Sequence, residues 1–476
     1  MKSNFKTQAP GLPFTLLTTL FLIICVATLD RSGYWLDEVL TVTDLRLDFF
    51  EMVRARALAG HGPVYFSLAW IWQRLVGEGE LATRLLPLCL GLIGLALFYA
   101  LLLRISDRTT ALLSTVLLFA NATLLLALQE ARPYSLTLPL VAAACFLLLR
   151  YENQPTTRKL FLLTLLAALA VNTHLAAALP LAGLIFYLLF RPQPARPPAL
   201  AISAGLLFAL PLLVVLILYR NTTGPVIWLP PMDLLSILQV PLVLAGICNL
   251  PLGNLDIPVA IVLSVLAFKG VRRFGDHGRL LLYLWLTPML FAVMLSFLLD
   301  KNFLFVQRYF VVPAMAQSAL LAGGLLELSL PRNFLRLAPA AAVTALFLWG
   351  AAFFFSVPKH LDIRQALPEL QNNLKKQEQL IIFTRNPKWF TFYNRDLPYR
   401  TQILQVRIVD DRPALRGHLH IRPSTTRVLI VIHNWDVSRE QLSNLLSSDH
   451  LILVDSVQIH ELTAFYAIPI GRALKL

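Results

Sequence analysis

Charge is scarce in this sequence: only 14% of its 476 residues are Asp, Glu, Lys or Arg, whereas 57% are hydrophobic. A soluble globule of this length cannot bury so much apolar surface, so the composition indicates a polytopic membrane protein. Acidic residues are the rarer sign, which gives a formal net charge of +14. The bases stand mainly in short connectors between apolar runs, where they set orientation in a bilayer, and we predict no nucleic-acid partner.

Cysteine is rarer still, and the four cysteines, Cys25, Cys89, Cys145 and Cys248, lack metal-ligand spacing. This argues against a zinc cluster or a disulfide framework. A small-residue cleavage site is also missing after the first apolar run, which follows Lys2 and Lys6. The run is therefore predicted to be a retained first span, not a signal peptide.

Apolar runs of the kind that form spans recur along the chain, and we predict about 11 crossings with the N-terminus inside. The runs are Leu12–Leu29, Leu85–Leu103, Ala111–Leu128, Tyr134–Leu149, Leu160–Val171, Leu175–Phe190, Ala199–Leu218, Ile257–Phe268, Leu280–Leu299, Tyr309–Leu326 and Leu337–Phe355. Every second connector should then be basic and inside, and these connectors carry Arg104/Arg108, Arg158/Lys159, Arg191/Arg196, Lys269/Arg272/Arg273/Arg279 and Arg332/Arg336.

The run Val64–Val76 is too short for the ~20 residues of a crossing, and counting it would invert every later loop. We predict an interfacial helix in the first outer loop, residues 30–84, with Tyr65, Trp70 and Trp72 in the aromatic zone. An earlier helix in this loop is predicted to start at a capping box on Asp48 and to stop at Gly60. The stretch Leu160–Phe190 is interpreted as two short crossings, because one crossing would place Arg191 outside.

After Phe355 the spans stop and strand-like runs appear at Leu380–Thr384, Val428–His433 and Leu451–Val454, with a helical stretch at Ser438–Leu446. The sequence therefore predicts two domains: a transmembrane domain over residues 1–356 and a small extracytoplasmic α/β domain over residues 357–476. An odd number of spans places the second domain outside.

The same topology places a set of polar side chains together on the outer side, close to the bilayer edge. They are Asp37 and Glu38, His61, Glu130, Arg132 and Tyr134, His174, and Arg308 with Tyr309. Ionisable groups at a membrane edge are costly to desolvate and often mark a functional site.

These residues stand in motifs that resemble those of a known superfamily. The motifs are Trp35-Leu36-Asp37-Glu38, His61-Gly62-Pro63-Val64-Tyr65, Gln129-Glu130-Ala131-Arg132-Pro133-Tyr134, Asn172-Thr173-His174 and Arg308-Tyr309. In this order they resemble the GT-C glycosyltransferases, in the bacterial branch similar to protein O-mannosyltransferases and aminoarabinose transferases (glycosyltransferase family 39 type). The resemblance covers residues 12 to 330. Gly62, where relatives often have a second proline, and Leu175, where many have an aromatic residue, depart from the pattern.

The resemblance implies a glycosyltransferase of the bacterial cytoplasmic membrane, acting on its outer face in lipid A or cell-envelope glycan modification. The donor would be a polyprenyl-phosphate sugar and the acceptor a hydroxyl on a lipid, glycan or protein. Because phosphate is a good leaving group, the reaction needs a base on the acceptor and cations on the phosphate. We assign Asp37 as the base, Glu38 as its orienting partner, and Arg132 and Arg308 to the phosphate, with inversion at the anomeric carbon.

Glu130, Tyr134, Tyr309, His61 and His174 complete the predicted substrate site. Each residue also has a structural interpretation: Asp37 and Glu38 can open a helix, Glu130 and Arg132 can form an ion pair, and each histidine can satisfy backbone groups. No cofactor is predicted, and no ligand spacing supports a divalent cation. The alternative functions are a transporter or flippase of lipid-linked saccharides, which should show internal repeats, and a membrane scaffold.

Overall fold

The structure, a computed structural model, describes residues 11–191, 195–219, 231–328, 338–356, 362–372, 378–384, 390, 392–393, 402–409, 412–416, 427–433, 451–459 and 462–469. The chain divides into two compact units, one formed by Met1–Leu29 with Asp44–Val357 and the other by Asp30–Thr43 with Pro358–Leu476. Residues 30–43, part of the predicted first outer loop, therefore group by their contacts with the second unit.

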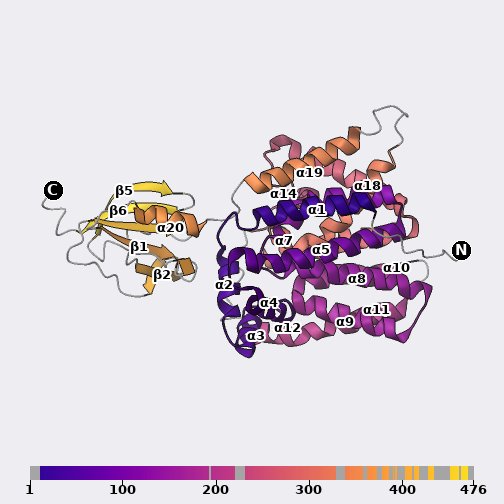
Figure 1. Cartoon of the computed structure of the whole chain (residues 1–476), viewed down its shortest axis with the longest axis horizontal. Coiled ribbons are helices and arrows are strands. Elements are labelled where there is room, and N and C mark those ends of the chain that lie inside the picture. The colour runs from indigo at the N-terminus through magenta and orange to yellow at the C-terminus, as the bar shows by residue number, and fades with distance from the viewer. Residues whose placement is uncertain are drawn as a thin grey trace. The chain divides into compact units, whose positions relative to one another are not determined.

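The first unit is helical, and its long helices lie side by side in a bundle (Figure 1). Its helices and 3-10 turns are α1 (Leu12–Thr28), α3 (Phe49–Leu58), α4 (Pro63–Val76), α5 (Glu80–Ile105), α6 (Arg108–Phe119), α7 (Ala122–Leu128), α8 (Tyr134–Asn153), α9 (Thr157–Thr173), η1 (Leu175–Ala177), α10 (Ala178–Phe190), α11 (Arg196–Leu206), η2 (Leu207–Ala209), α12 (Leu210–Leu218), α14 (Leu234–Leu238), α15 (Val240–Ala245), η3 (Gly253–Leu255), α16 (Asp256–Gly270), η4 (Val271–His277), α17 (Gly278–Leu299), η5 (Phe303–Phe305), η6 (Gln307–Phe310), α18 (Val311–Leu326) and α19 (Ala338–Ser356). Helix α8 packs against α5 and α9, α11 against α9, α10 against α17, and α18 against α16.

The described residues of all 11 predicted apolar runs are largely helical, and the prediction of a helical polytopic membrane protein is confirmed. Among the described residues, six helical segments have the length and composition of a span, or seven if α6 and α7, bent by 67°, form one broken span. The stretch Leu160–Phe190 forms two helices, interrupted where His174 adopts an extended backbone. The count of 11 crossings and the inside N-terminus stay predictions.

The predicted helices of the first outer loop are present as α3 and α4. Helix α3 ends as expected, because Gly60 adopts a positive φ of 83°. The capping box was wrong: Asp48 occupies the N-cap position, but its exposed side chain makes no capping hydrogen bond. At an exposed helix start, water can satisfy the free N–H groups instead. Helix α4 has only 14 residues. The indole N–H of Trp70 donates a hydrogen bond to the carbonyl of Leu47, and that of Trp72 donates one to the carbonyl of Ala82.

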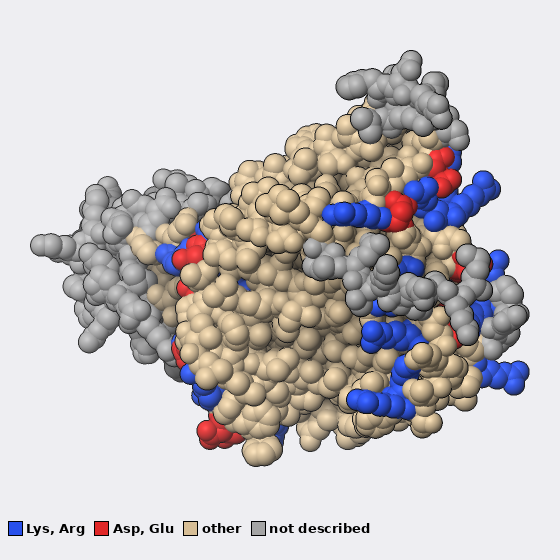
Figure 2. All heavy atoms as spheres, turned by 45° about the vertical axis from the view of Figure 1, so that its right-hand side comes forward, with Lys and Arg blue, Asp and Glu red and all other residues tan. Residues whose placement is uncertain are grey.

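Lys and Arg side chains gather at one end of the bundle, beside a largely uncharged helical surface (Figure 2). Arg273 in η4 links two other connectors at this end, since it lies 2.6 Å from Asp107 before α6 and 3.5 Å from Glu327 after α18. Arg191 pairs with Glu152 in the same way, across the ends of α10 and α8. The basic connectors at 104–108, 191 and 269–279 therefore form one charged end, as the alternation of basic connectors predicted.

The second unit contains α20 (Ile363–Asn372) and a six-stranded sheet with strand order β3-β2-β1-β4-β6-β5. The strands are β1 (Glu378–Thr384), β2 (Gln402–Val409), β3 (Arg412–Arg416), β4 (Arg427–His433), β5 (Leu451–Ile459) and β6 (Leu462–Pro469). Strand β1 is parallel to β2 and β4, and the other pairings are antiparallel. The predicted strands lie within β1, β4 and β5, whereas the predicted helix at Ser438–Leu446 lies outside the described residues.

The start of α2 (Leu36–Leu45) belongs to the core of this second unit. Val39 and Val42 of α2 are buried in one apolar cluster with Ile363 and Leu367 of α20 and with Ile382 of β1. Polar contacts add to this packing: Arg364 lies 2.7 Å from Asp30, and Tyr393 accepts a hydrogen bond from the N–H of Tyr34. The motif that holds Asp37 and Glu38 is thus fixed to the C-terminal sheet.

Candidate active site

Glu130 and Arg132, two of the predicted site residues, lie in a tight turn between α7 and α8. The turn is closed by a hydrogen bond of 2.7 Å from the N–H of Arg132 to the carbonyl of Glu130. Both side chains are buried, with 2% of Glu130 and 4% of Arg132 exposed. Since an ionised group is rarely buried without a partner, this turn must meet charges from elsewhere in the chain.

The second arginine comes from η6, far along the sequence. Arg308 lies 3.6 Å from the carboxylate of Glu130, and its side chain is 13% exposed. The guanidinium carbons of Arg308 and Arg132 lie 5.7 and 6.0 Å from the ring centroid of Tyr134, the first residue of α8. The two predicted phosphate-binding residues therefore converge on one tyrosine, and Arg308 also pairs with the carboxylate of Glu130.

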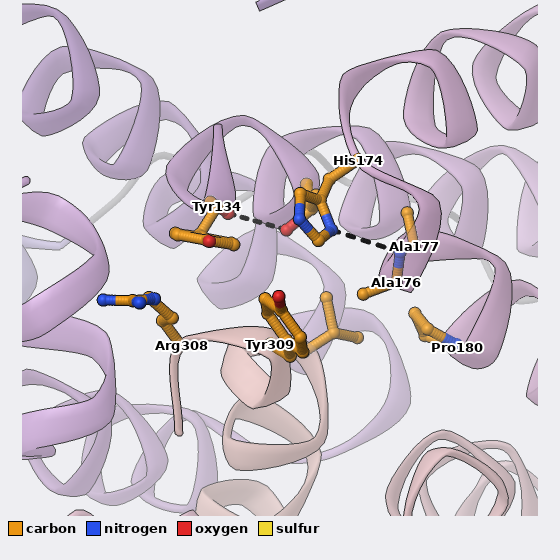
Figure 3. Close-up of a pocket in the computed structure, with 9 residues that line it drawn as sticks. Tyr134, His174, Ala176, Ala177, Pro180, Arg308 and Tyr309 are labelled. Atoms are coloured by element: carbon orange, nitrogen blue, oxygen red, sulfur yellow. Dashed lines mark hydrogen bonds between the residues drawn. The ribbon is translucent and has the colours of Figure 1, made fainter. Parts of the chain in front are cut away.

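A small cavity opens beside these groups in the same unit (Figure 3). The rings of Tyr134, His174 and Tyr309 line it, with centroids 5.0 to 5.7 Å apart. Nδ1 of His174 accepts a hydrogen bond of 3.1 Å from the N–H of Ala176, so a neutral ring carries its proton on Nε2. The predicted alternative, that this histidine satisfies a backbone group, is therefore correct for one nitrogen, while the ring still faces the cavity.

His61 reaches the cluster because of the glycine that follows it. A Cβ on Gly62 would lie 2.0 Å from the carbonyl oxygen of Asn172, so only glycine permits this close approach of the α4 start to the end of α9. The approach brings the ring of His61 to 6.2 Å from that of His174, and its Nε2 to 3.4 Å from a guanidinium nitrogen of Arg132. The departure from the family motif at Gly62 thus has a steric cause in this chain.

The electrostatics of the cluster favour an anion. Burial, and then Arg132 and Arg308, lower the pKa of His174 to about 3. Burial, and then Arg132, His174 and Arg56, hold the pKa of His61 well below its ordinary value. Both imidazoles are therefore neutral at pH 7, and the guanidinium groups of Arg132 and Arg308 stand beside them. Paired guanidinium donors of this kind suit a phosphate.

A pH dependence of stability follows from these two histidines. In the unfolded chain each ring titrates near pH 6.5, whereas in the fold it stays neutral to lower pH. Their contribution is complete above about pH 6.5 and is lost as the pH falls below it, with a slope of at most about 1.4 kcal/mol per pH unit for each ring. We expect His174→Gln and His61→Gln each to reduce the slope of unfolding free energy between pH 6.5 and 5. An unchanged slope in the double variant would contradict the assignment.

Asp37 and Glu38 stand in the first turn of α2, in the second unit. The carboxylate of Glu38 accepts a hydrogen bond of 3.4 Å from the N–H of Trp35, three residues earlier. This is the return bond of a capping box, so the helix-opening interpretation holds for Glu38. The carbonyl of Asp37 accepts a hydrogen bond of 2.8 Å from the hydroxyl of Thr41, one turn further along α2.

Some residues near the cluster carried no sequence signal. Thr137, Ala176 and Pro180 line the cavity, but small or apolar residues in apolar helices look like ordinary packing. Asn121 did carry a signal, since an asparagine inside an apolar run is a candidate helix cap, and it marks the break between α6 and α7. Within the described part of the chain, no three His, Cys, Asp or Glu side chains group as metal ligands, and metal dependence stays a matter of prediction.

The apolar helices define a polytopic membrane protein, and its connectors carry a cluster of buried acid and guanidinium groups. Residues 60–219 match the family model described as dolichyl-phosphate-mannose-protein mannosyltransferase, a range that includes His61, Glu130, Arg132, Tyr134 and His174. No curated protein matches the sequence.

The fold is similar to that of ArnT from Cupriavidus metallidurans bound to undecaprenyl phosphate, with a TM-score of 0.56 and 14% identity over 96% of this chain and 98% of that one. The apo state of the same protein gives a TM-score of 0.54 and 14% identity over 95% and 97% of the two chains. The resemblance to the GT-C glycosyltransferases that the motifs indicated is confirmed.

Proposed function

We propose that the protein is an integral-membrane glycosyltransferase that transfers a sugar from a polyprenyl phosphate to an acceptor hydroxyl. The observation that carries the proposal is the convergence of Arg132 and Arg308 on Tyr134, beside two neutral histidines. A guanidinium offers paired donors to phosphate oxygens, and burial strengthens the interaction. The similarity in fold to an ArnT bound to undecaprenyl phosphate supports a lipid-linked donor.

In the proposed reaction, Asp37 takes the proton of the acceptor hydroxyl as its oxygen attacks the anomeric carbon. The bond from that carbon to the phosphate oxygen breaks, and the polyprenyl phosphate leaves with its negative charge held by Arg132 and Arg308. Attack opposite the leaving group inverts the anomeric configuration. Glu38 holds the first turn of α2 and thereby orients Asp37.

The proposed setting is the outer face of a bacterial cytoplasmic membrane. The charged end that contains Arg273 and Arg191 would face the cytoplasm, since basic connectors are retained inside. Helices α6 and α9 begin at connectors of that end, and α7 continues the path of α6 after the bend, which supports an outer location for Glu130, Arg132 and His174. In this arrangement the chain crosses 11 times, and the α/β domain with its sheet lies outside.

The test is a transfer assay with the purified protein in lipid nanodiscs. A panel of radiolabelled undecaprenyl-phosphate sugars is incubated with a membrane extract, and label is followed into lipid, glycan and protein fractions. We expect transfer from at least one donor into one fraction. Movement of a fluorescent lipid-linked sugar across proteoliposomes, without transfer from any donor, would instead favour the flippase.

A further inference from the structure

The broken helix that leads to the candidate site is held by a buried polar junction. Asn121 is fully buried at the bend of 67° between α6 and α7. Its side-chain oxygen caps α7 by accepting the N–H of Thr123 at 2.9 Å, and its side-chain nitrogen donates to the carbonyl of Leu244 at 2.6 Å. One side chain thus joins the start of α7 to the end of α15.

A second side chain makes the same link. The hydroxyl of Thr123 donates to the carbonyl of Val243 at 2.7 Å. Helix α15 then ends at Gly246, whose φ of 71° permits a turn at which a Cβ would lie 2.3 Å from the nitrogen of Ala122. The two helix ends therefore abut, with the carbonyls at the end of α15 satisfied by residues of α7, as buried carbonyls require.

The segment around α15 also contacts the chain next to Arg308, the second arginine of the site. The side chain of Gln307, the residue before Arg308, contacts the sulfur of Cys248. Gln317 of α18 donates to the carbonyl of Pro241 at 2.8 Å while its oxygen accepts the indole N–H of Trp285 at 2.9 Å. Residues 241–248 are thus fixed on one side to α7, which leads to Glu130 and Arg132, and on the other to η6, which holds Arg308.

We infer that Asn121 and Thr123 are positioning residues for the candidate site: by docking α7 on residues 241–248 they set the spacing between Arg132 and Arg308. The inference rests on the proposed function, because the spacing between Arg132 and Arg308 affects donor binding only if both guanidinium groups bind the same donor phosphate. Misplacing one of two charged donors weakens binding even when the fold persists.

The test compares two buried threonines on the two limbs of the broken helix. The hydroxyl of Thr123 bridges to α15, whereas that of Thr115 donates to Ala111 within its own helix α6. We expect Thr123→Val to raise the KM for the donor and the Kd for undecaprenyl phosphate about tenfold, with a smaller change in kcat. Thr123→Ser should restore both constants, and Thr115→Val should stay within about twofold of wild type.

An independent measurement follows the junction without any donor. In a Cys89→Ala background, the rate of Cys248 alkylation by N-ethylmaleimide reports whether residues 241–248 stay docked; we expect Thr123→Val to speed it and Thr115→Val to leave it unchanged. Thr123→Ala, which also removes the hydroxyl that donates to Val243, should act like Thr123→Val and serves if that variant fails to fold.

Failure of the proposed function can be distinguished from failure of the positioning role. Wild-type protein that binds no undecaprenyl phosphate and transfers no sugar would overturn the proposed function, while the alkylation rates would still report on the junction. Equal alkylation rates and equal donor constants for Thr123→Val and Thr115→Val would overturn the positioning role.

Discussion

Replacing Asp37 by Asn is expected to slow sugar transfer by about 10² to 10⁴, because the acceptor hydroxyl then loses its general base. Asn keeps the size of the side chain and can still stand in the first turn of α2. Donor binding should be unaffected, since the proposed phosphate site lies on Arg132 and Arg308. The measurement is kcat with the active donor, together with the Kd for undecaprenyl phosphate.

A matched control for Asp37→Asn is available in the next helix. Asp48 precedes α3 and is exposed, and its side chain makes no capping hydrogen bond, so Asp48→Asn should leave transfer unchanged. Glu38→Gln removes the charge but keeps the orienting hydrogen bond, because the amide oxygen can still accept the N–H of Trp35. We expect it to lower kcat less than Asp37→Asn. Equal transfer by wild type and Asp37→Asn would remove Asp37 from the mechanism.

Replacing Arg308 by Gln is expected to lower kcat/KM by about 10² to 10³, the effect typical of removing one donor from a developing anion. Here the charge develops on the departing phosphate, and Arg308 is one of two guanidinium groups near Tyr134. Unlike Asp37→Asn, this variant should also weaken the binding of undecaprenyl phosphate. Arg308→Lys keeps the charge but not the paired donors and should be intermediate.

Arg191 provides the matched control for Arg308. It also pairs with a glutamate, Glu152, but at the charged end of the bundle. Arg191→Gln should therefore leave donor affinity unchanged, and the melting temperatures of both variants separate a loss of fold from a loss of binding. Donor affinity that is the same in Arg308→Gln and wild type would contradict phosphate binding by Arg308.

Local patterns predicted the helices well because apolar composition and helix stops act over a few residues. The runs from Leu12 onward became helices, Gly60 ended α3, and the strands at Leu380, Val428 and Leu451 are present. The prediction of a capping box at Asp48 was wrong, because water can satisfy the free N–H groups of an exposed helix start in place of the side chain.

The candidate site was predicted as a set of residues but not as an arrangement. The pairing of Arg308 with Glu130 and the contact of His61 with Arg132 join residues that are distant in the sequence. No local pattern encodes such distances. The need for glycine at position 62 comes from the backbone of Asn172, which lies too close to leave room for a Cβ and is 110 positions away in the sequence.

The sequence by itself determined a membrane-embedded helical chain and an inventory of acids, guanidinium groups and histidines, because hydrophobicity and residue chemistry belong to each residue alone. Only the tertiary structure decided that α7 breaks from α6 at Asn121 and docks on α15. It also decided that the helix bearing Asp37 packs into the core of the second unit, against α20 and the sheet. Those outcomes depend on how buried polar groups find partners from distant segments, and that is settled by packing.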